Sequence, residues 1–163
     1  DQFDVDDDDV DLGKMLHDVV SMNAPLADKH DIAVELTLPS GLPHIRTYRS
    51  GLRQIVQNLV SNATKYTPSG GRVIVSADRY DRGLKSSVRD NGIGMTPEEF
   101  EVAKRPFERN LSNAYVKETE GAGLGLSIVA ALAARLNFEI DFESRTGEGT
   151  VASVLISSKR MVQ

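Results

Sequence analysis

Hydrophobic positions recur at helical spacing in three long segments of the chain, which predicts helices at about residues 12–29, 50–66 and 124–136. In the first segment the apolar stripe comprises Leu12, Met15, Leu16, Val19, Val20 and Met22. Alternating apolar and polar residues predict strands at about 32–38, 72–80, 84–90, 138–144 and 150–157. Residues 96–99 have the pattern of a capping box with proline at the first helical position, so a short helix is expected there. This order of elements predicts an α+β fold, a two-layer sandwich in which one mixed sheet carries the three long helices on one face.

Two segments lack such periodicity. Residues 1–11 contain seven aspartates and no Lys or Arg. They are expected to be either a solvated acidic linker or an exposed first strand with Phe3, Val5 and Val10 facing inward. Residues 105–122 are expected to form a loop. Because 163 residues suit one domain of roughly 150, residues 12–163 are predicted to fold as a single unit.

Composition limits the possible functions. The chain carries 24 acidic and 19 basic residues, a net charge of -5. Outside residues 1–11, the acidic opening of the chain, the positive and negative charges nearly cancel, so no nucleic-acid surface is expected. The absence of cysteine excludes a disulfide framework and a thiolate metal site. The longest uncharged run, residues 121–134, is shorter than the roughly 18 residues of a membrane span. We therefore expect a soluble cytoplasmic domain that makes no membrane contact itself, even if the protein to which it belongs is membrane-anchored.

Two glycine clusters lie at the edges of predicted elements. Residues 90–94 (DNGIG) follow a strand, and residues 121–125 (GAGLG) open a helix. Glycine allows sharp turns and close approach to a ligand, and a helix N-terminus presents free N–H groups to an anion. The second cluster is therefore a candidate phosphate cradle, although either cluster could be an ordinary turn. The chain lacks the P-loop motif, the GxGxxG spacing (Leu126 occupies the last glycine position) and the protein Ser/Thr/Tyr kinase signatures.

The second predicted helix carries a polar sector beside its apolar stripe. At about 100° per residue, this sector contains Gln54, Asn58, Asn62 and Lys65. Amide oxygens suit a hard cation, and an ammonium group suits phosphates. Tyr66 projects nearer the apolar boundary, where its ring could flank a base. A solvated helix face is the alternative, but asparagine is a poor helix former, so two of them in mid-helix favour a functional role.

Together these segments resemble the catalytic, ATP-binding domain of the bacterial sensor histidine kinases. Residues 58–67 resemble the N box of that family, 90–94 the G1 box, 106–109 the F box and 121–127 the G2 box, in the family's order. The resemblance covers about residues 12–157 and implies the Bergerat-type fold shared with gyrase, Hsp90 and the MutL mismatch-repair ATPases. The chain departs from the family pattern at Lys104, where an aromatic residue is usual, and at Asn137, where the helix usually leads on through glycine.

The resemblance implies a role for each motif. Asp90 would accept a hydrogen bond from the adenine amino group, and Tyr66 would pack near the base. Asn62 would coordinate Mg²⁺ with Asn58 beside it, and Lys65 would contact the phosphates; Asn58 and Lys65 are also the candidate catalytic residues. Residues 105–122 would form a lid over the nucleotide. The other candidate nucleotide-binding residues are Gly92, Gly94, Arg105, Phe107, Arg109, Gly121, Gly123, Leu124, Gly125 and Leu126.

The function implied by the resemblance is donation of the γ-phosphoryl group of ATP to a histidine on a separate helical hairpin, with a response regulator receiver domain downstream. None of His17, His30 and His44 lies in a phosphoacceptor motif. An autonomous ATPase of the gyrase or Hsp90 type is one alternative. Such ATPases carry a glutamate base at the position of Asn58, and asparagine cannot take a proton at neutral pH. A nucleotide-sensing interaction module without transfer is the other.

Overall fold

A computed structural model describes residues 7–103 and 120–162 of the chain. In chain order the elements are β1 (Asp8–Val10), α1 (Leu12–Lys29), β2 (Ala33–Thr37), β3 (Ile45–Thr47), α2 (Arg49–Tyr66), β4 (Arg72–Tyr80), β5 (Gly83–Asp90), α3 (Pro97–Ala103), α5 (Glu120–Leu136), β6 (Glu139–Arg145), β7 (Gly149–Ser157) and the 3-10 helix η1 (Ser158–Arg160). Within these residues, no helix is both long and apolar enough to cross a membrane.

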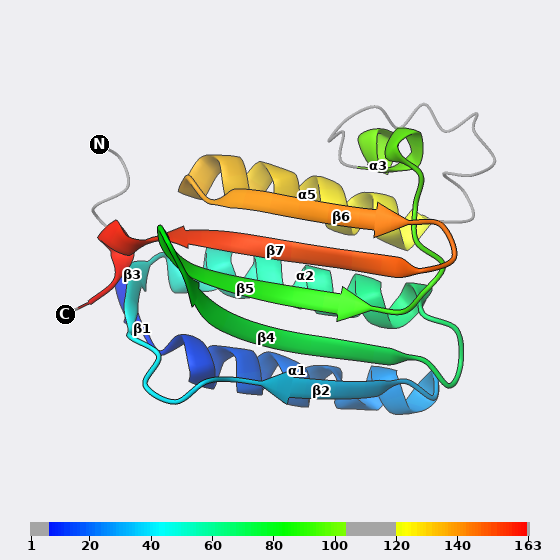
Figure 1. Cartoon of the computed structure of the whole chain (residues 1–163), viewed down its shortest axis with the longest axis horizontal. Coiled ribbons are helices and arrows are strands. Elements are labelled where there is room, and N and C mark those ends of the chain that lie inside the picture. Colours follow the sequence, from blue (N-terminus) through cyan, green and yellow to red (C-terminus); the bar gives the residue numbers. More distant parts are fainter. Residues whose placement is uncertain (1–6, 104–119, 163) are drawn as a thin grey trace.

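The described residues form a five-stranded mixed sheet in the order β2-β4-β5-β7-β6. Strand β2 is parallel to β4, and the other neighbouring strands are antiparallel. Helices α1, α2 and α5 lie side by side on one face of this sheet (Figure 1). The two-layer α+β sandwich predicted from the order of elements is therefore confirmed.

The core lies between the sheet and the helix layer, and α2 is the middle helix, packed against both α1 and α5. Its apolar stripe is almost wholly buried. The fully buried side chains of the helix layer and sheet include Leu12, Leu16, Val19, Leu52, Ile55, Val56, Val60, Val73, Leu84 and Ile156. Burial of about ten such side chains, each contributing roughly 1.5–3 kcal/mol, explains why the helices turn their predicted apolar faces toward the sheet.

The limits of the third long helix differ from the prediction. Helix α5 begins at Glu120, so residues 120–122 of the predicted loop are helical. Three glycines at the start of the helix conceal this first turn, because glycine lowers helix propensity without preventing helical geometry. The rest of the predicted loop, including Arg105, Phe107 and Arg109, lies outside the described residues.

The capping box before α3 forms as predicted. The Glu99 backbone amide donates to Thr96 Oγ1 at 3.1 Å, and the Thr96 amide donates to Glu99 Oε2 at 3.4 Å. These reciprocal bonds satisfy two amides at the start of the helix.

Part of the acidic opening is a strand. Strand β1 pairs antiparallel with β3 in a separate two-stranded sheet, and Val10 is only 2% exposed. Residues 8–10 therefore form a strand, which does not belong to the main sheet. Phe3 and Val5 lie outside the described residues, so the two alternatives for residues 1–11 as a whole stay predictions. Strand β3 escaped sequence analysis because three residues are too few to show a period.

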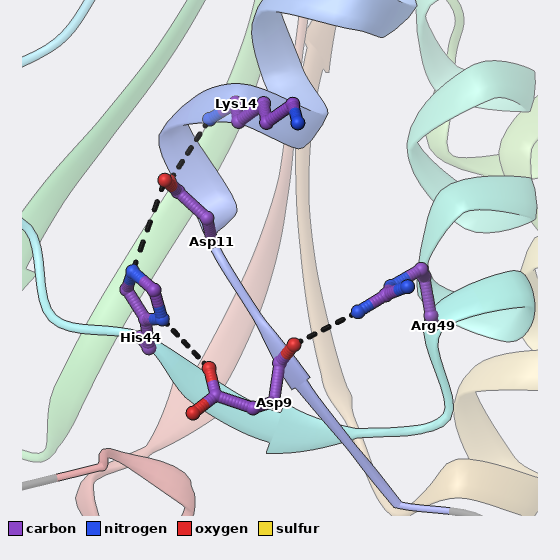
Figure 2. A network of polar contacts seen from close by, with 5 residues as sticks. All are labelled: Asp9, Asp11, Lys14, His44 and Arg49. Carbon is purple, nitrogen blue, oxygen red and sulfur yellow. Dashed lines mark hydrogen bonds and ion pairs between the residues drawn. The ribbon is translucent and has the colours of Figure 1, made fainter.

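Polar contacts fasten β1 to the body of the domain (Figure 2). Asp9 contacts His44 Nδ1 through its carboxylate at 2.6 Å, and its carbonyl accepts from Arg49 Nη2 at 2.9 Å. Asp11 Oδ1 accepts from the Lys14 amide at 3.1 Å and so caps α1. Through Asp9 this short strand is thereby tied to His44, just before β3, and to Arg49, the first residue of α2.

The prediction that Met22 belongs to the apolar stripe of α1 is wrong. Met22 is 58% exposed, whereas Asn23 is 2% exposed. At about 100° per residue, position 23 falls at the centre of the stripe and position 22 at its edge. Asn23 tolerates burial because its Nδ2 donates to the Val19 carbonyl at 2.8 Å and to Gln57 Oε1 at 3.0 Å. An amide pair formed by buried Asn23 and half-buried Gln57 thus joins α1 to α2.

We predict that Leu16→Ala lowers the free energy of unfolding by about 2–5 kcal/mol, because it opens a cavity in the core. Met22→Ala on the same helix is the matched control and should change the free energy by about 0.5 kcal/mol or less. Urea denaturation followed by circular dichroism measures both. Equal losses in the two variants would contradict the position assigned to the core.

Candidate functional site

A pocket with an empty volume of about 610 Å³ opens between α2, α5 and the sheet, where β5 and β6 end and β7 begins. Its wall is formed by Leu59, Asn62, Ala63, Tyr66, Val88, Asp90, Ile93, Gly94, Met95, Leu126, Phe142, Thr150 and Ala152. Most of these side chains are apolar and a few are polar. A pocket of this character suits a flat, largely apolar group that is oriented by a small number of hydrogen bonds.

The register of the sheet builds the floor of the pocket in two rows. Val88 pairs with Ala152, which pairs with Phe142, so an apolar row crosses β5, β7 and β6. Two residues further along, on the same face of each strand, Asp90 pairs with Thr150, which pairs with Ser144. The floor therefore changes from apolar to polar at the end of the sheet.

Asp90 is the carboxylate in the polar row. Its Oδ1 accepts a hydrogen bond from the Gly92 amide at 2.8 Å. Burial raises the pKa of the Asp90 carboxyl above its usual value. Hydrogen bonds from the Gly92 and Thr150 backbone amides lower the pKa, but they offset only part of the effect of burial. A half-buried carboxylate with this balance gains from a further hydrogen-bond donor, which a ligand in the pocket can supply.

The loop after β5 can follow its path only with glycine at two positions. A Cβ atom on Gly92 would lie 2.5 Å from the Tyr66 carbonyl oxygen at the end of α2. Gly94 has a φ of +69°, and a Cβ atom there would lie 2.0 Å from the Arg145 carbonyl oxygen. The loop is thus pressed between the end of α2 and the β6–β7 hairpin, which fixes Ile93 and Met95 in the pocket wall.

Two side-chain amide nitrogens on α2 lack a hydrogen-bond acceptor among the described residues. Asn58 Nδ2 and Asn62 Nδ2 are both buried, and neither finds a hydrogen-bond partner among the residues described. Among the residues that the structure describes, Asn58 Oδ1 accepts one 3.3 Å bond, from Gln54 Nε2. A buried unpaired donor costs about 1–3 kcal/mol. Two such donors one turn apart, one of them in the pocket wall, indicate a site built for a polar ligand.

The other predicted site residues that the structure describes lie in the pocket wall, near the end of α2 or at the start of α5. Tyr66 is half-buried in the pocket wall, and Leu126 is buried there at 7% exposure. Lys65 is exposed near the end of α2. The glycine-rich cluster of residues 121–125 forms the first turns of α5. Arg105, Phe107 and Arg109 lie outside the described residues, so their predicted roles remain predictions.

Sequence analysis missed several pocket residues. Phe142 and Thr150 belong to predicted strands, but only the pairing register brings them opposite Val88 and Asp90. Alternation alone would have placed Thr150 on the same face as Ala152 without identifying that face. Leu59, a buried apolar residue of α2, also lines the pocket.

Comparisons with known proteins agree with this geometry. Residues 47–160 match the family described as histidine kinase-, DNA gyrase B-, and HSP90-like ATPase. The histidine protein kinase DivJ of Caulobacter vibrioides is 42% identical over 128 residues, which cover 78% of this chain and 21% of that protein. The cell-division control histidine kinase PdhS of Brucella canis is 33% identical over an alignment covering 94% of this chain and 16% of the relative. The chain therefore spans about a fifth or less of the length of these relatives.

Solved structures show the same fold. The crystal structure of full-length ShkA in complex with AMPPNP is 30% identical, with a TM-score of 0.76 over 91% of this chain and 30% of that chain. The catalytic domain of the histidine kinase ThkA superposes with a TM-score of 0.77 over 93% of this chain and 95% of that chain, at 23% identity. Its arrangement of sheet and helices confirms the fold class. The chain belongs to the histidine kinase-, DNA gyrase B- and HSP90-like ATPase family, as a homologue of the catalytic domains of histidine protein kinases.

Proposed function

We propose that this domain binds ATP with Mg²⁺ and donates the γ-phosphoryl group to a histidine on a separate helical hairpin domain of the same protein, with a response regulator receiver domain as the downstream partner. The observation that carries the proposal is the combination of an apolar floor, a polar row that contains Asp90, and two buried amide nitrogens on α2 that lack a partner among the described residues.

Adenine fits this combination chemically. The base would lie on the row of Val88, Ala152 and Phe142, with its exocyclic amino group directed at Asp90. A carboxylate accepts hydrogen bonds and donates none, so it favours the amino group of adenine over the carbonyl oxygen that guanine has at the same ring position. Tyr66, from the wall, would flank the base.

The residues present also fit a magnesium ion held partly by the nucleotide. Among the described residues, no cluster of three or more His, Asp or Glu side chains could hold a metal by itself. Mg²⁺ commonly takes one or two protein oxygens together with substrate phosphates and waters. Asn62 lines the pocket, so its amide oxygen would be the protein ligand, with Asn58 one turn away on α2. The ion would neutralise phosphate charge.

The phosphates would extend from the base toward the start of α5. Backbone amides at a helix N-terminus bind anions, so those of residues 121–125, in the first turns of α5, would contact the phosphates. Lys65 would add a positive charge. Phosphoryl transfer requires mainly positioning and charge neutralisation. Asn58 cannot act as a base toward water, so a bound nucleotide is kept for another acceptor.

We expect Asp90→Asn to weaken ATP binding about 10- to 100-fold, because a neutral acceptor replaces a charge-assisted one. Isothermal titration calorimetry with ATP and with GTP measures the affinities. Asp78→Asn, an exposed aspartate on β4, is the matched control and should bind as the wild type does.

The same titration with adenosine, repeated at lower pH, tests the carboxylate itself. Burial raises the pKa of Asp90, so wild-type affinity should fall as the pH is lowered through this raised pKa. The Asn variant should lack that decline. Equal binding of ATP and GTP, or no effect of Asp90→Asn, would remove Asp90 from adenine recognition.

Replacing Asn62 by Ala should abolish the increase in ATP affinity that Mg²⁺ produces in the wild type, because the protein oxygen for the ion is lost. Magnesium titrations at fixed ATP, followed by calorimetry, report this increase. Wild-type protein in EDTA is the control and should resemble the variant. A magnesium dependence that survives in Asn62→Ala would assign the ion to other residues.

The chain alone should bind ATP without labelling itself or hydrolysing ATP rapidly. None of its three histidines lies in a phosphoacceptor motif: His17 and His30 are exposed side chains, and His44 Nδ1 contacts the Asp9 carboxylate. Incubation with γ-labelled ATP and Mg²⁺ should transfer label to an added hairpin domain, but not to the same hairpin with its histidine replaced by glutamine. Acid-labile label on this chain, or fast phosphate release without a hairpin, would contradict the proposal. Binding without any transfer would favour a nucleotide-sensing module.

A further inference from the structure

Ser144, on β6, contacts both the loop after β5 and the start of β7 through one oxygen. The Met95 backbone amide, in the loop after β5, donates to Ser144 Oγ at 2.7 Å. The hydroxyl of Thr150 lies 2.8 Å from the same oxygen, and the Gly149 carbonyl lies 3.3 Å from it. Ser144 is half-buried at the end of the polar row that also contains Thr150 and Asp90.

The single proton of Ser144 allows two arrangements. In one, Ser144 donates to Thr150 Oγ1, and the Thr150 proton is free to point into the pocket. In the other, Thr150 donates to Ser144, and Ser144 donates to the Gly149 carbonyl. Either hydroxyl can be the donor in the 2.8 Å contact. Thr150 can therefore offer the pocket a donor or an acceptor, depending on the proton of Ser144.

A hydrogen bond from the Thr150 hydroxyl to a ring nitrogen of adenine requires the first arrangement. Its amino group lies between two ring nitrogens, N1 and N7, which accept hydrogen bonds. A base whose amino group faces Asp90 therefore presents an accepting nitrogen beside that carboxylate. Thr150 pairs directly with Asp90 and lines the pocket, so its hydroxyl is the side-chain donor next to the carboxylate in the register of the sheet.

We propose that Ser144 is a positioning residue for the base: its hydroxyl donates to Thr150 and so directs the Thr150 proton toward a ring nitrogen. The inference rests on the proposed binding of adenine nucleotides and adds a residue that does not line the pocket itself. Formation of this arrangement gives up only the longer 3.3 Å contact with Gly149, while the Met95 amide keeps Ser144 in place.

Ser144→Ala should lower ATP affinity about fivefold, the effect expected from one neutral hydrogen bond. Thr150→Val should lower it to a similar extent, and the double variant should bind no more weakly than Thr150→Val alone, because Ser144 acts through Thr150. Ser87→Ala is the matched control. Its hydroxyl pairs with Ser153 Oγ at 2.8 Å across β5 and β7, outside the pocket wall, and its loss should leave affinity unchanged.

A readout specific to the ring nitrogen comes from calorimetry with ATP, 1-deaza-ATP and 7-deaza-ATP. In the wild type, one of the two deaza analogues should bind more weakly than ATP. In Ser144→Ala that penalty should shrink, whereas a merely structural loss would weaken all three ligands equally. Thermal melts establish that each variant is folded. If Ser144→Ala melts below the assay temperature, Ser144→Cys, which keeps the volume with a weaker donor, replaces it.

The outcomes separate this inference from the proposed function. Failure of wild-type protein to bind ATP would overturn the proposed function. Three other outcomes, each with wild-type protein that binds ATP, would overturn only the role of Ser144. The first is a deaza-analogue penalty that is unchanged in the Ser144 variant, and the second is additive losses of affinity in the double variant. The third is that both deaza analogues bind the wild type as tightly as ATP does.

Discussion

The packing of helix α2 is the constraint on which the rest of the domain depends. Its 18 residues have to fill the middle of the helix layer and also supply one wall of the pocket. Ile55, Val56 and Val60 are buried in the core, while Asn58 and Asn62 lie on the adjoining side. Rotation of α2 by a fraction of a turn would either expose the core stripe or bury the amides in it. The part-buried Asn23–Gln57 amide pair fixes that rotation against α1.

The opposite wall depends on close backbone contact rather than on side chains. The loop after β5 is held between the end of α2 and the β6–β7 hairpin, where the Gly147 amide donates to the Ile93 carbonyl at 2.7 Å. Gly92 and Gly94 permit this approach, which accounts for the glycine spacing without any direct contact with a ligand. The hairpin, the loop and α2 therefore define the pocket together, although they come from distant parts of the sequence.

The sequence was sufficient to predict what depends on local periodicity. Helices α1 and α2 begin and end within one residue of the prediction, and Asn62, Tyr66, Asp90, Gly94 and Leu126 do line one pocket. It was insufficient where long-range pairing decides. Strand β3 is too short to show a period, and the row of Asp90, Thr150 and Ser144 exists only through the register of three strands. Asn23 entered the core because Gln57, 34 residues away, satisfies its amide.

The unpaired nitrogens of Asn58 and Asn62 have a consequence for any attempt to make this domain more robust. A fold that buries two unsatisfied donors is less stable when empty than the same fold with apolar groups of similar shape at those positions. Selection of variants by melting temperature alone would therefore favour replacement of these asparagines. The thermostable proteins recovered in this way would retain the sandwich and lose the chemistry of the pocket, so a screen for stability needs ligand present throughout.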